Sequence, residues 1–219
     1  WPRKLTVADI GCGAGAHSQL WSESGHEVFG LDVSQPLIEI ARKRTQELGL
    51  QVKFEVGSAT ALPYADQSVD VCILPELLEH IADWQSCLRE AARVVRVGGV
   101  LYLSTTNLFC PVQEEFTLPC YSWYPSVLKR RYERLAVTSR PELVHFASFP
   151  AVNWFSYYGL RNFLKTLGLA SFDRFDLISI LSQGTWKGRL ATAVARQPSM
   201  KFLAQFVVPS CLIFAVRER

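Results

Sequence analysis

The chain has 219 residues, of which 49% are hydrophobic, and its 23 basic and 20 acidic side chains leave a formal net charge of +3. This length and apolar content suit one folded domain and exclude a disordered chain. The charge is too close to balance for a protein that binds nucleic acid through a broad basic face, so no nucleic-acid partner is expected.

Features of the whole chain also predict its compartment. Six cysteines are spread without a Cys-x-x-Cys pair, which indicates free thiols in a reducing environment. The first four residues lack the zones of a signal peptide. The most apolar late segment, residues 202–216, is interrupted by Gln205 and Pro209 and is shorter than the roughly 20 residues that a spanning helix needs. We therefore expect a cytoplasmic protein without a transmembrane helix.

In chain order, short apolar runs alternate with helical patterns up to residue 106. The alternation predicts a parallel sheet wrapped by helices. Gly98 and Gly99 would end the helix that precedes the last of these strands, and Arg93 and Arg96 suit its final turn, where cations meet the negative end of the helix dipole. The expected strands are 5–10, 27–32, 52–56, 69–74 and 100–106, and the expected helices are 19–24, 37–48 and 84–97.

The pattern changes at Asn107, where a long segment rich in proline, aromatic and basic residues begins. Long loops inside a compact domain are usually functional. We therefore assign all of residues 1–219 to one domain and treat residues 107–156 as a substrate-side insert or lid within it. Beyond the insert we expect a helix at 157–167, strands at 172–178 and 211–217, and a helical stretch at 186–208 broken by Pro198.

A glycine-rich turn follows the first expected strand, with Gly11, Gly13 and Gly15 at alternate positions. Glycines allow a sharp bend and a close approach of the backbone to a ligand. The spacing also satisfies the dinucleotide fingerprint in its alanine-ended form, which leaves an NAD-dependent oxidoreductase open. Asp9, just before the turn, favours a ligand with an ammonium group, because a carboxylate would repel a pyrophosphate.

Six short pieces of the chain carry a family resemblance: 8–15 (ADIGCGAG), 30–34 (GLDVS), 57–63 (GSATALP), 68–71 (SVDV), 78–81 (LEHI) and 97–99 (VGG). With these pieces in this order, the chain resembles class I S-adenosylmethionine (SAM)-dependent methyltransferases. Within that class, residues 76–80 resemble the ubiquinone-biosynthesis O-methyltransferases and their small-molecule relatives. The resemblance implies a Rossmann-like α/β three-layer sandwich with a seven-stranded, mostly parallel sheet whose last strand is antiparallel.

The same resemblance implies where the cofactor SAM binds. It places the methionine end of SAM at the glycine turn and the ribose on Asp32, which could accept hydrogen bonds from a ribose diol in either cofactor class. The family often has an acid where this chain has Ser58, so the hydrogen bond to the adenine amino group would be weaker or reoriented. The expected cofactor-binding residues are Asp9, Gly11, Cys12, Gly13, Gly15, Asp32, Val33, Ser58, Ala59 and Leu74.

Glu76, Glu79 and His80 are the candidate catalytic residues, because positions three and four apart share one helix face. In the resembling quinone enzymes this pattern is associated with a divalent metal, which could lower the pKa of the acceptor hydroxyl. His80 as a general base and a purely structural, helix-capping role remain open. No metal site is therefore assigned.

The predicted function is methyl transfer from SAM to a small-molecule acceptor, in the first place to a hydroxyl oxygen of an aromatic, quinone-like, sugar or lipid-linked compound. A non-catalytic SAM-binding subunit is the other alternative beside the oxidoreductase. The aromatic residues of the insert either line an acceptor site or pack a small core of their own. A peripheral membrane contact through Lys201, Phe202, Phe206 and Val207 is expected if the acceptor is lipid-linked. The oligomeric state is not predicted.

Overall fold

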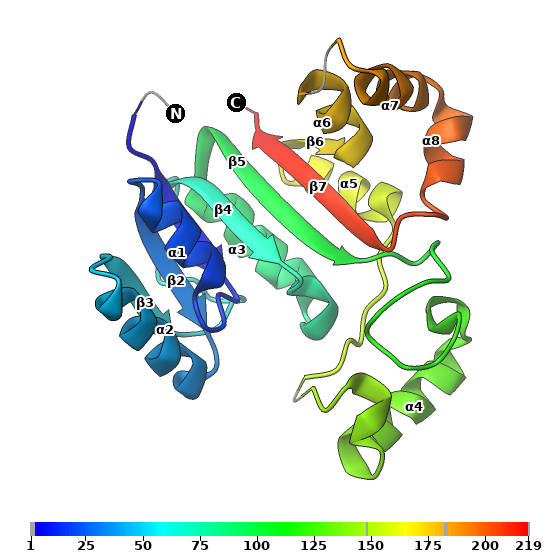
Figure 1. Ribbon diagram of the computed structural model, residues 1–219, viewed down its shortest axis with the longest axis horizontal. Coiled ribbons are helices and arrows are strands. Elements are labelled where there is room, and N and C mark those ends of the chain that lie inside the picture. Colours follow the sequence, from blue (N-terminus) through cyan, green and yellow to red (C-terminus); the bar gives the residue numbers. More distant parts are fainter. Residues whose placement is uncertain (1–2, 148, 182–183, 219) are drawn as a thin grey trace.

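The computed structural model describes residues 3–147, 149–181 and 184–218 and has a twisted sheet at its centre with helices packed on both faces (Figure 1). The sheet has seven strands in the order β3-β2-β1-β4-β5-β7-β6. β7 pairs antiparallel with both β5 and β6, whereas the other pairs are parallel. The fold class predicted from the sequence, including the antiparallel last strand, is confirmed. The strands are β1 Thr6–Ile10, β2 Glu27–Asp32, β3 Val52–Val56, β4 Val69–Pro75, β5 Val95–Thr106, β6 Leu169–Asp173 and β7 Ser210–Arg217.

Both faces of the sheet are covered, which explains why its central strands are apolar throughout. β4 is buried at six consecutive positions, as expected of a strand with helices on each side. Trp21 of α1 (Ala16–Glu23) packs on one face, against Val7 and Val28. Leu88 of α3 (Trp84–Val94) and Leu160 of α5 (Tyr157–Thr166) pack on the other. The remaining helix of this first half, α2 (Gln35–Glu47), buries Ile38 and Ala41 against Phe54.

α3 ends three residues before the predicted end of its helix, and the two glycines do not terminate it. Val95 already has an extended backbone and begins β5. The side chain of Arg217, from the last strand, donates hydrogen bonds to the carbonyls of Ala92, Arg93 and Val95. These carbonyls include orphan acceptors of the helix end. The helix therefore ends at the point where the side chain of a distant residue supplies hydrogen-bond donors for its last carbonyl groups.

The strand predicted at 172–178 is wrong from Arg174 onward, and the strand that is present begins earlier, at Leu169. β6 stops at Asp173, and residues Arg174–Leu181 form helix α6. Asp173 Oδ1 accepts hydrogen bonds from the backbone N–H groups of Phe175 and Asp176, while Asp176 Oδ2 accepts one from the N–H of Asp173. This reciprocal capping satisfies the first donors of a helix and fixes its start.

The helical stretch expected near the end of the chain is present as two helices, α7 (Trp186–Arg196) and α8 (Pro198–Ala204), which separate at Pro198 as predicted. Among the described residues, no helix combines the length and the apolar character needed to cross a bilayer. All six cysteines are free.

The insert, residues 107–156, folds around a small core of its own. It contains helix α4 (Ser126–Thr138) and the 3-10 turns Tyr121–Trp123 and Pro141–Val144. The rings of Phe116 and Tyr121 stack with their centroids 3.9 Å apart, and Trp154 packs edge-on against Tyr121. These three aromatic side chains therefore pack with each other. The insert leaves the sheet at the edge where the parallel strands end (Figure 1).

Candidate functional site

The glycine turn after β1 has the backbone that its sequence predicts. Gly11, Gly13 and Gly15 all have positive φ angles, of 72°, 52° and 78°. A Cβ atom at Gly11 would lie 2.6 Å from Cδ1 of Leu77, whereas one at Gly13 would meet nothing within 4 Å. A side chain at Gly11 would therefore clash with Leu77. Gly13 faces open space, so a ligand can approach the backbone there.

Asp32, at the end of β2, holds this turn in place. Its Oδ2 accepts a hydrogen bond of 2.9 Å from the N–H of Gly13, and its Oδ1 accepts one of 2.8 Å from the N–H of Ser34. Each carboxylate oxygen retains further acceptor capacity. The next side chain, Val33, is exposed. Asp32 can therefore fix the turn and bind a diol at the same time.

Asp9 lies deeper than a ligand-facing carboxylate. Its side chain is fully buried, its Oδ2 accepts a 2.6 Å hydrogen bond from the hydroxyl of Ser18, and its Oδ1 has no partner among the described residues. Burial raises the pKa of this carboxyl group. A buried acceptor without a partner is costly, and a cationic group of a cofactor beside the turn would relieve that cost. This feature fits the ammonium group of SAM.

The remaining residues expected around the cofactor differ in exposure. Ser58 is exposed, and its hydroxyl is occupied within its own loop by Thr60, with an Oγ–Oγ1 distance of 2.8 Å. Ala59, the residue after Ser58, is buried. Cys12, which lies within the glycine turn, is buried as well. Leu74 is fully buried in the main core, so it presents no exposed surface to a ligand.

The acidic segment after β4 lies directly beside the glycine turn, because Leu77 packs against Gly11. The helix predicted for this segment is only a 3-10 turn, Leu78–His80, and Glu76 precedes it with a φ of 46°. Such a backbone is strained for a residue other than glycine, and strain of this kind concentrates at functional sites. The N–H of Glu76 is held by the carbonyl oxygen of Ser104 at 2.9 Å.

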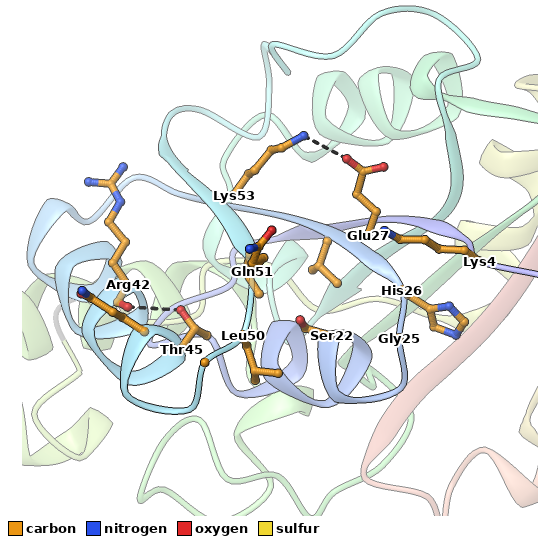
Figure 2. A pocket seen from close by; sticks show the side chains of 14 residues that line it. Lys4, Ser22, Gly25, His26, Glu27, Arg42, Thr45, Leu50, Gln51 and Lys53 are labelled. Carbon is orange, nitrogen blue, oxygen red and sulfur yellow. Dashed lines mark hydrogen bonds and ion pairs between the residues drawn. The ribbon is translucent and has the colours of Figure 1, made fainter.

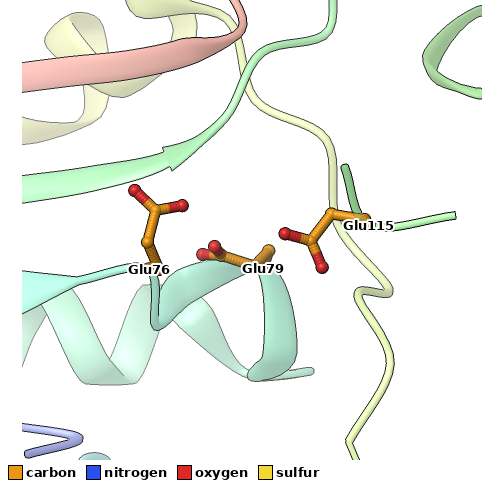
Figure 3. A group of neighbouring side chains, drawn as sticks. All are labelled: Glu76, Glu79 and Glu115. Carbon is orange, nitrogen blue, oxygen red and sulfur yellow. The ribbon is translucent and has the colours of Figure 1, made fainter. Parts of the chain in front are cut away.

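Three carboxylates meet at this turn: Glu76, Glu79 and Glu115 (Figure 3). One carboxylate oxygen from each lies within 4.8 Å of those of the other two. Glu79 is fully buried; its Oε2 accepts a 2.7 Å hydrogen bond from the hydroxyl of Thr105, and its Oε1 has no partner among the described residues. Burial, reinforced by the proximity of Glu76, raises the pKa of Glu79 to about 9. The buried carboxyl group therefore keeps its proton at neutral pH.

Glu115 belongs to the insert and was not among the residues selected from the sequence. Burial raises its pKa as well. The available signal was the pair Glu114-Glu115 within an otherwise aromatic segment that follows a sheet strand. His80 lies next to the cluster but is not part of it, and its buried Nδ1 has no partner among the described residues.

The end of the insert fixes the 3-10 turn in position. The side-chain amide of Asn153 donates to the carbonyls of Leu78 and Ile81, and the N–H groups of Val152 and Asn153 both donate to the carbonyl of Glu79. Because the carbonyl groups of the turn accept hydrogen bonds from another segment, the turn cannot move without that segment. The position of Glu79 therefore depends on the insert.

A depression of the surface lies away from this site. It has a volume of about 640 Å³ and is lined from the beginnings of the first strands and from α2, by residues that include Lys4, His26, Arg42 and Lys53 (Figure 2). Lys53 is paired with Glu27 at 2.9 Å. Open parallel sheets bind their ligands at the carboxyl ends of the strands, which is the opposite edge. This depression is therefore distinct from the candidate site.

The comparisons with known proteins agree with this geometry. Residues 8–103 match the family described as "Methyltransferase domain". The chain is 36% identical over 103 residues to a ubiquinone biosynthesis O-methyltransferase of Sinorhizobium fredii, an alignment that covers 47% of this chain and 42% of that protein. The chain thus spans less than half the length of the curated relatives that it matches.

Solved structures with the same fold cover nearly the whole chain. The SAM-dependent methyltransferase from Mesorhizobium loti superposes with a TM-score of 0.64 over 98% of this chain and 91% of its own, at 17% identity. The YcgJ protein from Bacillus subtilis gives a TM-score of 0.61 over 99% and 93%, at 20% identity. At these identities the likeness concerns the fold. Residues 8–103, which include the glycine turn held by Asp32, thus match the methyltransferase-domain family, and the fold is the one seen in solved SAM-dependent methyltransferases.

Proposed function

We propose that the protein transfers the methyl group of SAM to a hydroxyl oxygen of a small-molecule acceptor that binds between the glycine turn and the insert. The observation that carries the proposal is the contact of Leu77 with Gly11, which brings the carboxylates of Glu76 and Glu79 beside the turn where the family binds its cofactor. A group that can receive a proton is needed next to the methyl donor when the nucleophile is a hydroxyl.

Each residue of the turn has a distinct part in binding. Asp32 accepts the ribose hydroxyls, Gly13 lets the backbone approach, and the free Oδ1 of Asp9 attracts the ammonium group. When bound, SAM supplies a methyl group that is already activated by its sulfonium. The protein therefore has mainly to hold the acceptor oxygen close to that methyl group and in line with it.

The carboxylates differ in what they can do with a proton. Glu79 is protonated at neutral pH, so it donates a hydrogen bond rather than acting as a base. Glu76 is exposed, and His80 has an unused ring nitrogen. We assign the removal of the acceptor proton to Glu76 or His80, and we expect pH–rate profiles of Glu76→Gln and His80→Gln to identify which one it is.

The donor set also fits a divalent cation. Glu76, Glu79 and Glu115 offer oxygen ligands only, which suits a hard ion such as Mg²⁺. An ion bound by the unpartnered Oε1 of Glu79 would displace the proton that this carboxyl group otherwise keeps. A cation held there would lower the pKa of the acceptor hydroxyl. Titration calorimetry with Mg²⁺ and Mn²⁺ tests this directly, and Glu115→Gln should weaken binding while leaving SAM affinity unchanged.

Calorimetry with SAM and with its demethylated product tests the proposed function, followed by incubation with methyl-labelled SAM and a panel of catechols and hydroxyquinones. We expect binding of both ligands and labelled product from the chain alone. Absence of binding would contradict the cofactor assignment. Binding without labelled product from any hydroxyl acceptor would favour a SAM-binding subunit that activates a partner.

A further inference from the structure

Helices α6, α7 and α8 form a separate layer beyond β6 and β7, at the upper right of Figure 1. They occupy the connection between these two strands, outside the region of the methyltransferase family match. Their outward side chains differ from those of an ordinary water-facing surface. The difference is clearest along α7 and α8.

On α7 the exposed residues form one stripe at spacings of three and four. Trp186 and Leu190 are 71% and 56% exposed, and Arg189, Ala193 and Arg196 are exposed on the same stripe. Gly188 and Ala191 are buried on the opposite side. A helix normally buries its large apolar residues and exposes its polar ones. Here the outward stripe combines an aromatic and an aliphatic side chain with arginines, as in helices that lie in a membrane interface.

On α8 and the residue stretch after it, the outward stripe is entirely apolar. Met200, Leu203 and Val207 follow at intervals of three and four, and Leu203 and Val207 are 64% and 77% exposed. Lys201, which was expected to face a membrane surface, instead turns inward and is only 14% exposed. Its Nζ lies 2.8 Å from Oδ2 of Asp176 and 3.2 Å from Oδ2 of Asp173. The helix thus buries its cation and exposes its apolar residues.

Near the start of this layer, Ile180 and Leu181 of α6 are 56% and 81% exposed. We define the outer face by exposed residues of the three helices and of the stretch after α8: Ile180, Leu181, Trp186, Arg189, Leu190, Arg196, Met200, Leu203 and Val207. Soluble proteins rarely expose a large apolar cluster, and a cluster that is rimmed by polar residues usually marks an interaction site.

The charge of this region selects the kind of partner. No aspartate or glutamate lies between Asp176 and Glu218, and Asp176 is itself paired with Lys201. Arg189 and Arg196 form no ion pair with the described residues. A second copy of the chain would bring like charges together across the contact. A surface that is negatively charged and has an apolar interior suits both the arginines and the apolar stripe.

We propose that the outer face docks the protein peripherally on an anionic lipid bilayer. The arginines contact the lipid headgroups, and Trp186, Leu190, Leu203 and Val207 insert at the boundary with the acyl chains. The layer is also fixed to the edge of the sheet that holds the candidate site. The side-chain amide of Asn107, directly after β5, donates to the carbonyls of Gln205 and Val208. Docking would thus hold the site in a fixed position relative to the bilayer, and it does not require SAM.

Flotation with vesicles tests the proposal independently of methyl transfer. We expect the purified protein to float with vesicles of phosphatidylglycerol and phosphatidylcholine, to remain unbound with phosphatidylcholine alone, and to be released by high salt. Leu203→Glu should lower the lipid partition coefficient by about tenfold or more. The double variant Arg189→Gln and Arg196→Gln should lower it by about 30-fold at low salt.

Val137→Glu is the matched control, because Val137 is 70% exposed on α4, outside the outer face, and should bind like the unaltered protein. Circular dichroism and thermal unfolding confirm that each variant is folded. Equal binding to both vesicle types, or undiminished binding by folded Leu203→Glu, would overturn the proposal. A dimer in light scattering that Leu203→Glu converts to a monomer, without vesicle binding by either, would assign the face to a second copy instead.

Discussion

The half of the chain that contains the glycine turn and the half that contains the insert are built in different ways. In residues 3–106, the key contacts join neighbouring parts of one sheet: Asp32 holds Gly13, and Leu77 packs on Gly11. In residues 107–218, function-bearing groups are positioned by contacts between distant segments, as when Asn153 fixes the turn that contains Glu79. A cofactor common to a whole family can be served by a local motif, whereas an acceptor specific to one protein needs elements that vary.

The largest effect is expected from breaking the cofactor half at Asp32. Asp32→Ala removes an acceptor from the N–H groups of Gly13 and Ser34 and from the ribose, and should weaken SAM binding by about 100-fold or more, since hydrogen bonds to a charged group contribute about 1.5–3 kcal/mol each. Titration calorimetry measures this change. Glu39→Gln, on the exposed side of α2, is the control and should bind SAM normally. An Asp32→Ala protein with unchanged affinity would place the ribose elsewhere.

The next effect concerns the turn that contains Glu79, which Asn153 of the second half fixes in position, and it depends on pH. The pKa of Glu79 is raised to about 9 in the folded protein, so the native state holds this proton more tightly than the unfolded chain does. Its contribution to stability is complete at acidic pH, below the ordinary pKa of glutamate, and is lost as the pH rises toward 9, by about 1 kcal/mol per pH unit at the steepest.

Urea unfolding between pH 5 and pH 9 measures this dependence. Glu79→Gln keeps the shape of the side chain without a titrating proton, so its stability should vary less over the same range. Mg²⁺ should reduce the loss at high pH in the unaltered protein if it binds the three carboxylates. If the free energy of unfolding changed with pH in the same way in both proteins, Glu79 would be ionised at neutral pH, contrary to the prediction.

A third prediction separates backbone strain from packing within the cofactor half. Gly15→Ala places a Cβ 3.0 Å from atoms of Ala41 and Phe54 at a φ of 78° and should lower the free energy of unfolding by about 2–4 kcal/mol. Gly49→Ala has a similar φ of 68° but open space around the added atom, so strain alone should cost about 1–2 kcal/mol. Urea denaturation compares the two variants. Equal losses would mean that Ala41 and Phe54 move away without cost.

The smallest effect is expected at the adenine side. Ser58→Asp introduces the acid that the family often has at this position and should strengthen SAM binding by a few-fold, in line with about 1 kcal/mol for one added hydrogen bond. Because the Ser58 hydroxyl is occupied by Thr60, Ser58→Ala should change the affinity little. A loss of affinity in Ser58→Ala would indicate that the serine itself contacts the adenine.

The sequence by itself located the first five strands, the glycine turn and Asp32 at the end of the second strand, because these depend on hydrophobic alternation and on backbone angles that are local properties. It also located Pro198 as the division between two helices. The roles of the individual cofactor and catalytic residues stay predictions for the experiments above to decide.

Only the tertiary structure decided the rest. Arg217 ends α3, Glu115 joins Glu76 and Glu79, and Lys201 turns inward, each through contacts between segments far apart in the chain. The orientation of a charged side chain depends on which partner folding brings within hydrogen-bond distance, because burial without that partner is costly. A pattern of neighbouring residues carries no information about that partner.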